Sequence, residues 1–515
     1  MALRFLQWQT PMRKEILVKV KTRTGIKESI GVADGVEAFL GIPYAKPPVG
    51  ERRWKAPQRL DDSDAVQVCD SLGCSAMQER DEIELASMHE QSEDCLTLNI
   101  WRKGDAGENL PVMVYIHGGA YFSGGSADPL YNGANFAKAH DVVIVTINYR
   151  LNVFGSLCLW ALPGGEEYTD AGYLNILDQI CALEWIKENI GAFGGDPNCI
   201  TLFGESAGSS SAALLSVCPR AKGLFQRVIC ESGPIDLYKT REKGEYFARE
   251  IAKASGCATA QDLLALSSEE VIAGMREYCA AHPFEVSLTF APVCDGMLLP
   301  KKPMKAWAEG AARDVDVMIG CTEDEFQYFT FYFKPEEMPS FWGGQLPIHF
   351  DDQIDVKRWE KIYEDASPDK PLKDNYIDFM NQTGFFVLSD LMAEQQSAYR
   401  PVFNYLFRYK SRIEGMGACH AIEVPFVLKN LDTKDGLEFT GPNPPEHLAD
   451  EMSNAWYGFA KDGVPTTPNG VKWPSYDASH HVHMVVDEKG WVVESNRNER
   501  ANELFRPMAD VLLND

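Results

Sequence analysis

The feature that most constrains the fold is the stretch that surrounds Ser206. The residues before it, Cys-Ile-Thr-Leu-Phe at 199–203, are apolar or β-branched and predict a buried strand. Gly-Glu-Ser-Ala-Gly follows at 204–208, and then come small residues and leucines that can begin a helix. A strand, tight turn and helix of this kind hold the serine in a strained conformation, with its hydroxyl exposed beyond the end of the sheet. A Gly-x-Ser-x-Gly match alone is often only a glycine-rich turn, but this context indicates that Ser206 is a nucleophile.

Strands and helices alternate on either side of that stretch. Residues 142–148 form a continuous apolar run, typical of a strand buried on both faces of a parallel sheet. Isoleucines and leucines recur at helical spacing over 175–190, which predicts a helix with one face on that sheet. Further strands are predicted at 315–320 and 401–409. Alternation of this kind favours an open α/β sheet.

The chain shows no internal repeat and no linker-like change in composition. We therefore expect residues 1–515 to form a single catalytic domain, with helical insertions at 234–314 and 335–400. Alternating strands between 15 and 40 predict an antiparallel meander at the start of the chain. A helical pattern runs over 241–266.

Charge and cysteine usage narrow the partners and the compartment. The net charge of −26 repels nucleic acid and anionic membranes, so we expect neither as a partner. The first residues lack the apolar core of a signal peptide, and no apolar run is long enough to span a bilayer. Thirteen cysteines without a Cys-x-x-Cys pair indicate buried thiols in a reducing compartment. We expect a cytoplasmic monomer or small homo-oligomer with no cofactor and no metal.

A serine hydroxyl becomes a good nucleophile when an imidazole, oriented by a carboxylate, takes its proton. In sheets of this kind the acid and then the histidine follow the serine, each on a loop after a strand. The strand at 315–320 leads to Glu323, Asp324 and Glu325, and spacing alone does not choose among them. Of the six histidines after Glu325, only His420 follows a central-looking apolar strand with a glycine-rich approach. We therefore predict that His420 is the base.

The negative charge that develops on a substrate carbonyl oxygen needs preset hydrogen-bond donors. Backbone N–H groups of a glycine-rich loop after a strand, together with the N–H that follows the nucleophile, provide them. Here these donors would be Gly118, Gly119, Ala120 and Ala207. A glycine loop alone is weak evidence, but its position after a strand and ahead of the serine favours this role.

Several stretches together resemble the type-B carboxylesterases, the family that includes cholinesterases and bacterial para-nitrobenzyl esterases. The matching stretches, which begin with Gly-Ile-Pro-Tyr-Ala and cover nearly the whole chain, are 41–50, 92–96, 116–119, 148–150, 193–197, 204–208, 292–296, 324–325, 456–465 and 473–476. The resemblance implies an α/β-hydrolase fold, with a large, mostly parallel sheet flanked by helices and helical insertions over the active site. It also implies a triad of Ser206, Glu325 and His420, and an oxyanion hole at the four residues named above.

The resemblance implies further roles. The substrate pocket would draw on Tyr121, Phe122, Glu205, Val286, Leu288, Phe326 and Phe329, although an aromatic cluster of this kind is as often plain core. Arg53 with Glu93, and Arg150 with Asp178, would be structural ion pairs. Secreted members bridge cysteines at the positions of Cys74 and Cys95, and we predict free thiols here.

The chain departs from the family pattern at four positions. Ala120, Phe326 and Ala421 stand where many members have glycine, and we expect none of the three to remove catalysis. Leu85 stands where cholinesterases place the tryptophan that binds choline, which argues against a cholinesterase.

The leading hypothesis is hydrolysis of small to medium apolar esters through an acyl-enzyme. An amidase, carbamate hydrolase or thioesterase would use the same triad. A non-catalytic binding protein is a second class, because the family includes adhesion molecules, but those typically lack the nucleophile. A metallohydrolase using His481 and His483, which share one face of a strand, is a third class, and an ordinary edge strand explains these histidines better.

Overall fold

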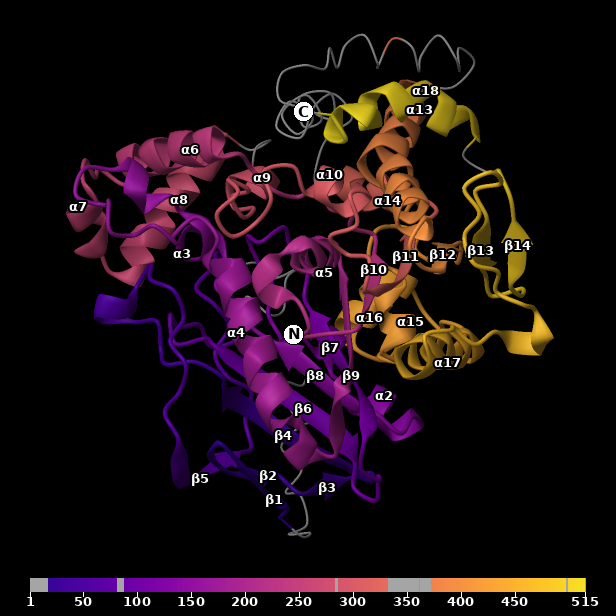
Figure 1. Cartoon of the computed structure of the whole chain (residues 1–515), viewed down its shortest axis with the longest axis horizontal. Helices are drawn as coiled ribbons and strands as arrows, with labels where there is room; N and C mark the ends of the chain where they lie inside the picture. The colour runs from indigo at the N-terminus through magenta and orange to yellow at the C-terminus, as the bar shows by residue number, and fades with distance from the viewer. Residues whose placement is uncertain are drawn as a thin grey trace.

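The structure is a computed structural model of the chain, and it describes residues 17–80, 88–282, 286–331, 361, 372–496 and 499–514. Its centre is a large sheet with helices on both sides (Figure 1). In chain order the strands of this sheet are β3 (Val32–Ala33), β4 (Val36–Pro43), β6 (Thr97–Lys103), β7 (Leu110–Ile116), β8 (Val143–Ile147), β9 (Gly195–Glu205), β10 (Arg227–Glu231), β11 (Asp316–Thr322), β12 (Val402–Phe407), β13 (His483–Val486) and β14 (Val492–Glu494). Across the sheet their order is β14-β13-β12-β11-β10-β9-β7-β8-β6-β4-β3.

The middle of the sheet is parallel and its ends are antiparallel. The strands from β8 across to β13 run parallel to their neighbours. By contrast, β14 at one end and β6, β4 and β3 at the other pair antiparallel. The strands predicted at 142–148, 315–320 and 401–409 correspond to β8, β11 and β12. The predicted mostly parallel sheet of an α/β-hydrolase fold is therefore confirmed.

Alternate side chains of the central strands enter two separate cores. On β7, Val112 and Val114 pack on one face, in the core that also contains residues of α4 (Leu174–Asn189) and α5 (Ala207–Val217). Met113 and Tyr115 pack on the other face, with residues of α2 (Ala134–Ala139) and α17 (Glu446–Asp462). Both faces are covered, which explains why these strands are apolar without alternation. The helix predicted over 175–190 is α4.

The first strands depart from the predicted meander. β1 (Lys19–Thr22) and β2 (Thr24–Ser29) do pair antiparallel, but β2 then pairs in parallel with β5 (Ser63–Cys69) in a small sheet of its own. β3 and β4 join the large sheet instead. The prediction was wrong on this point because strand pattern reveals neighbours in sequence, whereas β5 is a distant partner.

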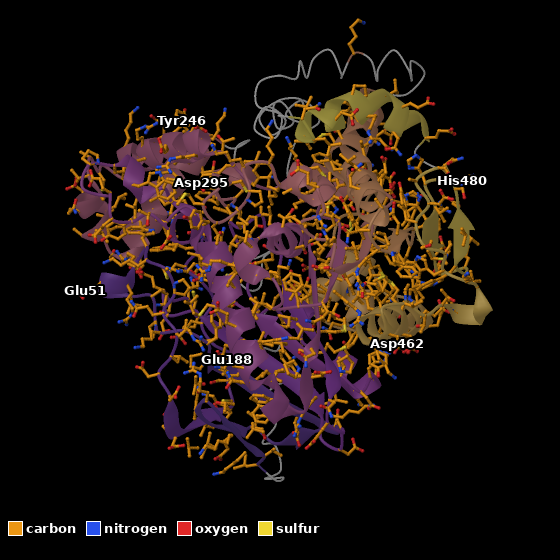
Figure 2. The ribbon with its side chains drawn as sticks, in the orientation of Figure 1. Glu51, Glu188, Tyr246, Asp295, Asp462 and His480 are labelled. Atoms are coloured by element: carbon orange, nitrogen blue, oxygen red, sulfur yellow. The ribbon has the colours of Figure 1, made fainter. Side chains whose placement is uncertain are left out.

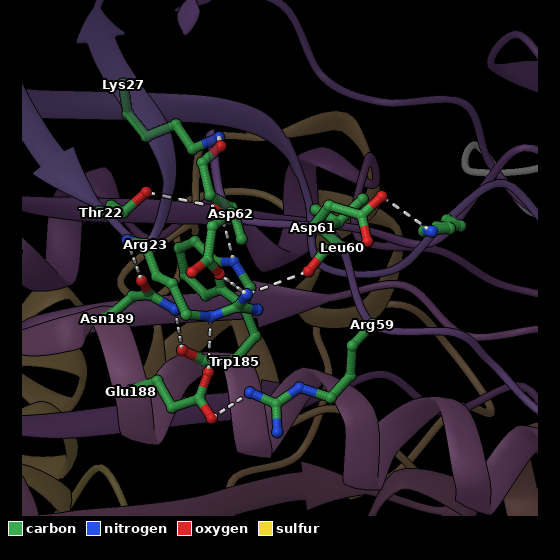
Figure 3. A network of polar contacts seen from close by, with 12 residues as sticks. Thr22, Arg23, Lys27, Arg59, Leu60, Asp61, Asp62, Trp185, Glu188 and Asn189 are labelled. Atoms are coloured by element: carbon green, nitrogen blue, oxygen red, sulfur yellow. Dashed lines mark hydrogen bonds and ion pairs between the residues drawn. The ribbon is translucent and has the colours of Figure 1, made fainter. Parts of the chain in front are cut away.

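A polar network joins this small sheet to the end of α4 (Figure 3). The Arg23 N–H donates to Asn189 Oδ1 at 2.9 Å, and its guanidinium contacts both Glu188 and Asp62. Trp185 Nε1 donates to Thr24 Oγ1 at 3.1 Å. These contacts fix the small sheet on the C-terminal half of α4.

The insertions after β10 and β11 are helical where they are described. The helix predicted over 241–266 is wrong as a single unit, because it is divided into α6 (Arg241–Ala254) and α7 (Ala260–Leu264). Gly256, at φ +68°, ends the first helix, and the reciprocal hydrogen bonds of Thr259 and Asp262 begin the second. In the second insertion α13 (Leu372–Asn381), a π-helical turn at Gln382–Phe386 and α14 (Val387–Ser397) are described. Of residues 335–371 only 361 lies within the described part.

Three labelled acidic side chains lie on the outside of the molecule. Glu51, Glu188 and Asp462 are exposed and point outward from three different parts of the fold (Figure 2). None of the helices in the described ranges combines the length and the apolar character that a transmembrane span requires. All thirteen cysteines lie within the described residues as free thiols.

Two ion pairs lie beside the core, one buried and one half-buried. The Arg150 guanidinium donates from Nε and Nη2 to the two oxygens of Asp178 at 2.7 and 2.6 Å, and both side chains are nearly inaccessible. Arg53 similarly donates from Nε and Nη2 to the two oxygens of Glu93, which also accepts from the hydroxyl of Ser268. The predicted structural ion pairs are therefore confirmed.

We expect Asp178→Asn to destabilise the protein by about 3–5 kcal/mol, because it leaves the buried guanidinium of Arg150 without a counter-charge. Urea unfolding followed by fluorescence measures this loss. The matched control is Asp64→Asn, since Asp64 pairs with Lys21 at 3.1 Å on the surface with both side chains more than 70% exposed. An equal shift of the unfolding midpoint in both variants would contradict a special role for the buried pair.

Candidate active site

Ser206 lies at a sharp turn between β9 and α5. Its backbone is at φ 56° and ψ −121°, a strained conformation for a residue with a side chain. Its N–H donates to the carbonyl of Glu231 on the neighbouring strand at 2.9 Å. A Cβ at Gly204 or Gly208 would lie 2.4 or 1.9 Å from the carbonyl oxygen of Ile116. The predicted strand, turn and helix are therefore present, and the two glycines permit β7 to approach the turn.

Glu325 and His420 meet on the loops after β11 and β12. Glu325 Oε1 accepts from the N–H of Thr322 at 2.7 Å, which fixes the carboxylate on the end of its own strand. Its Oε2 lies 2.6 Å from His420 Nδ1. The backbone N–H of His420 also donates to the backbone carbonyl of Glu325 at 3.2 Å. Both side chains are buried, so the contact is made in a low-dielectric environment.

The two other acids on the same loop have different partners. Glu323 pairs with Arg408 at 3.0 Å, and Asp324 Oδ2 accepts from the Ala418 N–H at 2.8 Å. Asp324 therefore shapes the loop that carries His420, while only Glu325 contacts the imidazole. Of the three acids that spacing left open, Glu325 is therefore the one whose carboxylate lies against His420.

The other ring nitrogen of His420 lies beside Glu205. Its Nε2 is 2.9 Å from Glu205 Oε1. This contact does not have the geometry of a hydrogen bond, and within the described part of the chain Glu205 Oε1 accepts none. Burial lowers the pKa of His420, but the charges of Glu205 and Glu325 outweigh it and raise the pKa well above its usual value. Burial also raises the pKa of Glu205, against the opposing effect of His420. Since Glu205 precedes Ser206, the imidazole lies at the turn that carries the serine.

The glycine-rich loop after β7 covers this turn. A Cβ at Gly118 would lie 2.9 Å from the carbonyl oxygen of Glu205 and 3.2 Å from Ser206 Cβ. Gly119 and Ala120 both have positive φ, at 95° and 53°. None of the hydrogen bonds recorded among the described residues uses the N–H groups of Gly118, Gly119 or Ala120. Ala421, the other alanine at a family glycine position, also has a positive φ of 67°.

Aromatic side chains surround the imidazole. The ring of Phe329 lies 5.4 Å from that of His420, and Phe326 lies 4.9 Å from Phe329. Phe385, which our sequence analysis missed, is closer, at 5.1 Å. It belongs to the π-helical turn, a deviation that often marks functional sites but leaves little trace in the sequence pattern.

The remaining predicted pocket residues lie in different environments. Phe122 stacks on Phe290, another residue that the sequence analysis missed, at 5.5 Å, and Leu288 is buried beside this pair in the same core cluster. Tyr121 is fully buried, with its hydroxyl 2.8 Å from Ser211 Oγ, which is a core environment. Val286 begins a short helix, and its side chain lies outside the described part, as does Leu85.

Two more buried carboxylates, those of Glu231 and Glu423, lie near Glu205 at the Ser206 turn. Burial raises the pKa of Glu231, at the end of β10, to about 8, although a hydrogen bond from Trp456 opposes this shift. Burial and then the neighbouring carboxylates raise the pKa of Glu423 well above its usual value, and its Oε1 accepts from the Ser232 hydroxyl at 3.0 Å. Our sequence analysis did not name either residue. The position of Glu423, three residues after His420, was the available signal, but such spacing does not show that a side chain is buried.

His481 and His483 have partners of their own. His481 Nδ1 lies 2.7 Å from the Tyr476 hydroxyl, and His483 Nε2 lies 2.9 Å from the buried carboxylate of Asp390. His481 lies in the turn before β13, and β13 lies between β12 and β14 in the sheet, so the predicted edge strand with both histidines on one face is wrong.

Comparison with known proteins agrees with this geometry. The model of the carboxylesterase family matches residues 16–504. The chain is 35% identical to the para-nitrobenzyl esterase of Bacillus subtilis (strain 168), covering 92% of this chain and 95% of that protein. It is 32% identical to the phenmedipham hydrolase of Pseudarthrobacter oxydans, with 92% and 94% covered. The crystal structure of a carboxylesterase of Geobacillus stearothermophilus at pH 6.2 is similar, with a TM-score of 0.82, 36% identity, and 94% and 99% covered.

These matches span the sheet, the turn at Ser206 and the loops of Glu325 and His420. They confirm the resemblance that the sequence motifs indicated. The chain belongs to the carboxylesterase family.

Proposed function

We propose that this protein is a serine hydrolase that cleaves small to medium apolar carboxylic esters through an acyl-enzyme intermediate. The observation that carries this proposal is the buried imidazole of His420, held by Glu325 at 2.6 Å on one nitrogen and lying 2.9 Å from Glu205, the residue before Ser206, with the other. A similar protein is named a para-nitrobenzyl esterase, which supports aromatic esters as substrates.

In the first half-reaction Ser206 Oγ attacks the ester carbonyl carbon, and His420 takes the serine proton. The carbonyl oxygen becomes an oxyanion, for which the N–H groups of Gly118, Gly119, Ala120 and Ala207 are the proposed donors. The bond to the alcohol oxygen then breaks, and the imidazolium returns the proton to the leaving alcohol. Glu325 holds the ring through Nδ1–H throughout and stabilises its positive charge.

In the second half-reaction water takes the place of the alcohol. His420 accepts a proton from water, the resulting hydroxide attacks the acyl carbon, and a second tetrahedral intermediate forms. Its collapse breaks the bond to Ser206 Oγ, which regains a proton from the imidazolium, and the carboxylic acid leaves. The chain's own residues carry every proton transfer in this scheme.

For the substrate pocket we propose two walls. Phe326 and Phe329, beside the imidazole, form one, and Phe122 with Leu288 and Val286 forms the other, on the acyl side. Glu205 lies between them, while the buried environment of Tyr121 favours a supporting role beneath the oxyanion loop. Apolar walls with a few polar groups suit small organic esters.

Other substrate classes for the same triad, and a non-catalytic role, are less favoured. Amides, carbamates and thioesters need the same triad, but family membership favours esters. A non-catalytic binding protein is disfavoured because Ser206, Glu325 and His420 are all present and in a supporting geometry.

We further propose that the protein works as one catalytic unit in the cytoplasm, as a monomer or small homo-oligomer, and without a nucleic-acid or membrane partner. The net charge of −26 and the thirteen free thiols support this proposal. The single family match over residues 16–504 supports one unit.

We expect Ser206→Ala to lower kcat by roughly 10⁶-fold, because no other group can form the acyl-enzyme. With p-nitrophenyl acetate in a stopped-flow instrument, the wild type should release one equivalent of p-nitrophenolate in a burst, and the variant should show none. Ser216→Ala is the matched control, since that buried hydroxyl only bonds the Ala212 carbonyl within the same helix. A burst that survives in Ser206→Ala would refute the assignment of the nucleophile.

We expect Glu205→Gln to move the acid limb of the kcat/KM profile to lower pH. The charges of Glu205 and Glu325 stabilise the imidazolium and so raise the pKa of His420, whereas only the neutral imidazole can accept the serine proton. Removing one charge lowers that pKa, and the neutral form then persists to lower pH. Glu51→Gln, an exposed glutamate, is the control, and an acid limb that stays in place in both variants would contradict the electrostatic assignment.

We expect Gly118→Ala to lower kcat by about 10²–10³-fold with a small change in KM, as for loss of an oxyanion donor. The added Cβ would meet Glu205 and Ser206 at 2.9–3.2 Å, so the loop must move away from the turn. Gly107→Ala, where nothing lies within 4 Å of the added atom, is the control. Steady-state kinetics on p-nitrophenyl acetate distinguish the two, and equal activity would show that the loop does not serve the oxyanion.

A further inference from the structure

Lys239 is a buried lysine that no part of the mechanism uses. Its exposed fraction is 1%, and it lies in the loop between β10 and α6. Within the described part of the chain it forms no ion pair with a carboxylate, which is unusual because a buried ammonium needs compensation. Only neutral acceptors surround it.

The ammonium of Lys239 has three such acceptors. Nζ donates to the carbonyl and the hydroxyl of Ser156 at 2.9 and 3.1 Å, and to the carbonyl of Thr289 at 2.5 Å. The Ser156 hydroxyl then donates to the carbonyl of Phe290 at 2.7 Å. The lysine and the serine together therefore hold two successive carbonyls, those of Thr289 and Phe290.

The backbone of Lys239 holds the same segment a few residues later. Its N–H donates to the Pro292 carbonyl at 3.0 Å, and its own carbonyl accepts from the Cys294 N–H at 2.9 Å. Residues 289–294 are thus fastened to Lys239 by both the main chain and the side chain. These hydrogen bonds together fix the position of residues 289–294.

The fastened segment leads to the acyl-side wall. The Phe290 ring stacks on Phe122, with ring centroids 5.5 Å apart and an interplanar angle of 25°. Phe122 directly follows the glycine loop, and its backbone N–H donates to the Gly119 carbonyl at 2.8 Å. Ser156 ends α3 (Asn152–Ser156), and the first residue of that helix, Asn152, donates from Nδ2 to the Phe122 carbonyl at 3.2 Å. One short helix and one lysine therefore fix the wall and the oxyanion loop relative to each other.

We propose that Lys239 is a positioning residue for substrate specificity, whose ammonium holds the buried Phe290 behind Phe122, the half-buried side chain of the acyl-side wall, and so limits the length of the acyl chain. This inference rests on the proposed esterase function. Burial lowers the pKa of Lys239 to about 8, with the Cys158 thiol raising it slightly, so the ammonium form prevails at pH 7. At that pH the charge strengthens all three bonds to the neutral acceptors.

The test compares Lys239→Met with the wild type at pH 7 on two series of esters. One series varies the acyl chain from acetyl to octanoyl with p-nitrophenol as the constant leaving group. The other varies the alcohol of acetate esters. We expect the variant to raise the octanoyl-to-acetyl ratio of kcat/KM by about tenfold, mainly through KM, while the ratios of the alcohol series stay within twofold.

Lys27→Met is the matched control. Lys27 is equally buried, at 2% exposed, and its ammonium also bonds only neutral acceptors, the Thr24 carbonyl and Gln67, but it lies in the small sheet away from the site. Its loss should lower the unfolding temperature without altering either substrate profile. A merely structural role for Lys239 would give the same pattern as Lys27.

Should Lys239→Met fail to fold, Ser156→Ala removes the hydroxyl that holds the Phe290 carbonyl and keeps the lysine. We expect it to shift the acyl profile in the same direction by a smaller factor. An acyl profile identical to the wild type in whichever variant folds would overturn the proposal for Lys239. Failure of the wild type to hydrolyse any ester would instead refute the proposed function, and this inference with it.

Discussion

The strained backbone of Ser206 is the constraint on which the site depends. A positive φ at a residue with a side chain costs about 1–3 kcal/mol and persists only where the surroundings over-determine it. Here β9 is fixed between β7 and β10 by parallel ladders, and the Ser206 N–H continues the ladder to Glu231. The two flanking glycines admit the carbonyl of Ile116 at the turn. The sheet thus holds the serine at its edge, where the loops after the neighbouring strands can reach it.

The carboxyl ends of the parallel strands concentrate acidic groups around one imidazole. Glu205 and Glu231 end β9 and β10, and Glu325 follows β11. Three ionised carboxylates so close together in a buried site would repel one another strongly. With burial raising the pKa of Glu231 to about 8, that group is mostly neutral at pH 7, which leaves Glu205 and Glu325 to face His420. The site therefore favours the imidazolium that ester cleavage generates, without gathering more charge than a buried site tolerates.

The local parts of this arrangement could be predicted from the sequence, and the long-range parts could not. The turn at Ser206 is specified by adjacent residues, since the strand, the glycines and the helix are all within one short stretch. The proposed choice of Glu325 over Glu323 and Asp324 depends on where Arg408 and Ala418 lie, and both residues belong to the loop after β12, more than 80 residues away.

The features that our sequence analysis did not predict also depend on backbone geometry and on distant partners. Phe385 reaches the imidazole because one helical turn is widened to a π-helix, a change of backbone that the helical residue pattern does not record. β5 pairs with β2 in parallel, a partnership that no local alternation encodes. By contrast, the division of the helix over 241–266 had a local signal in Gly256 and in the Thr259–Asp262 pair, so the sequence contained that information.

The strand order of the sheet has a consequence for how the protein is made. The serine, the acid and the histidine enter from positions 206, 325 and 420, and β12 and β13 pair with the sheet only after most of the chain has been synthesised. A nascent chain that stops short of β12 would already contain the serine turn, Glu325 and the aromatic residues of the site, but not the loop that carries His420. Non-local parallel pairing of this kind is slow, because loop closure must precede the contacts that reward it. The site is therefore completed only after β12 and the loop that follows it have formed, and a chain that ends earlier has open strand edges, which favour aggregation.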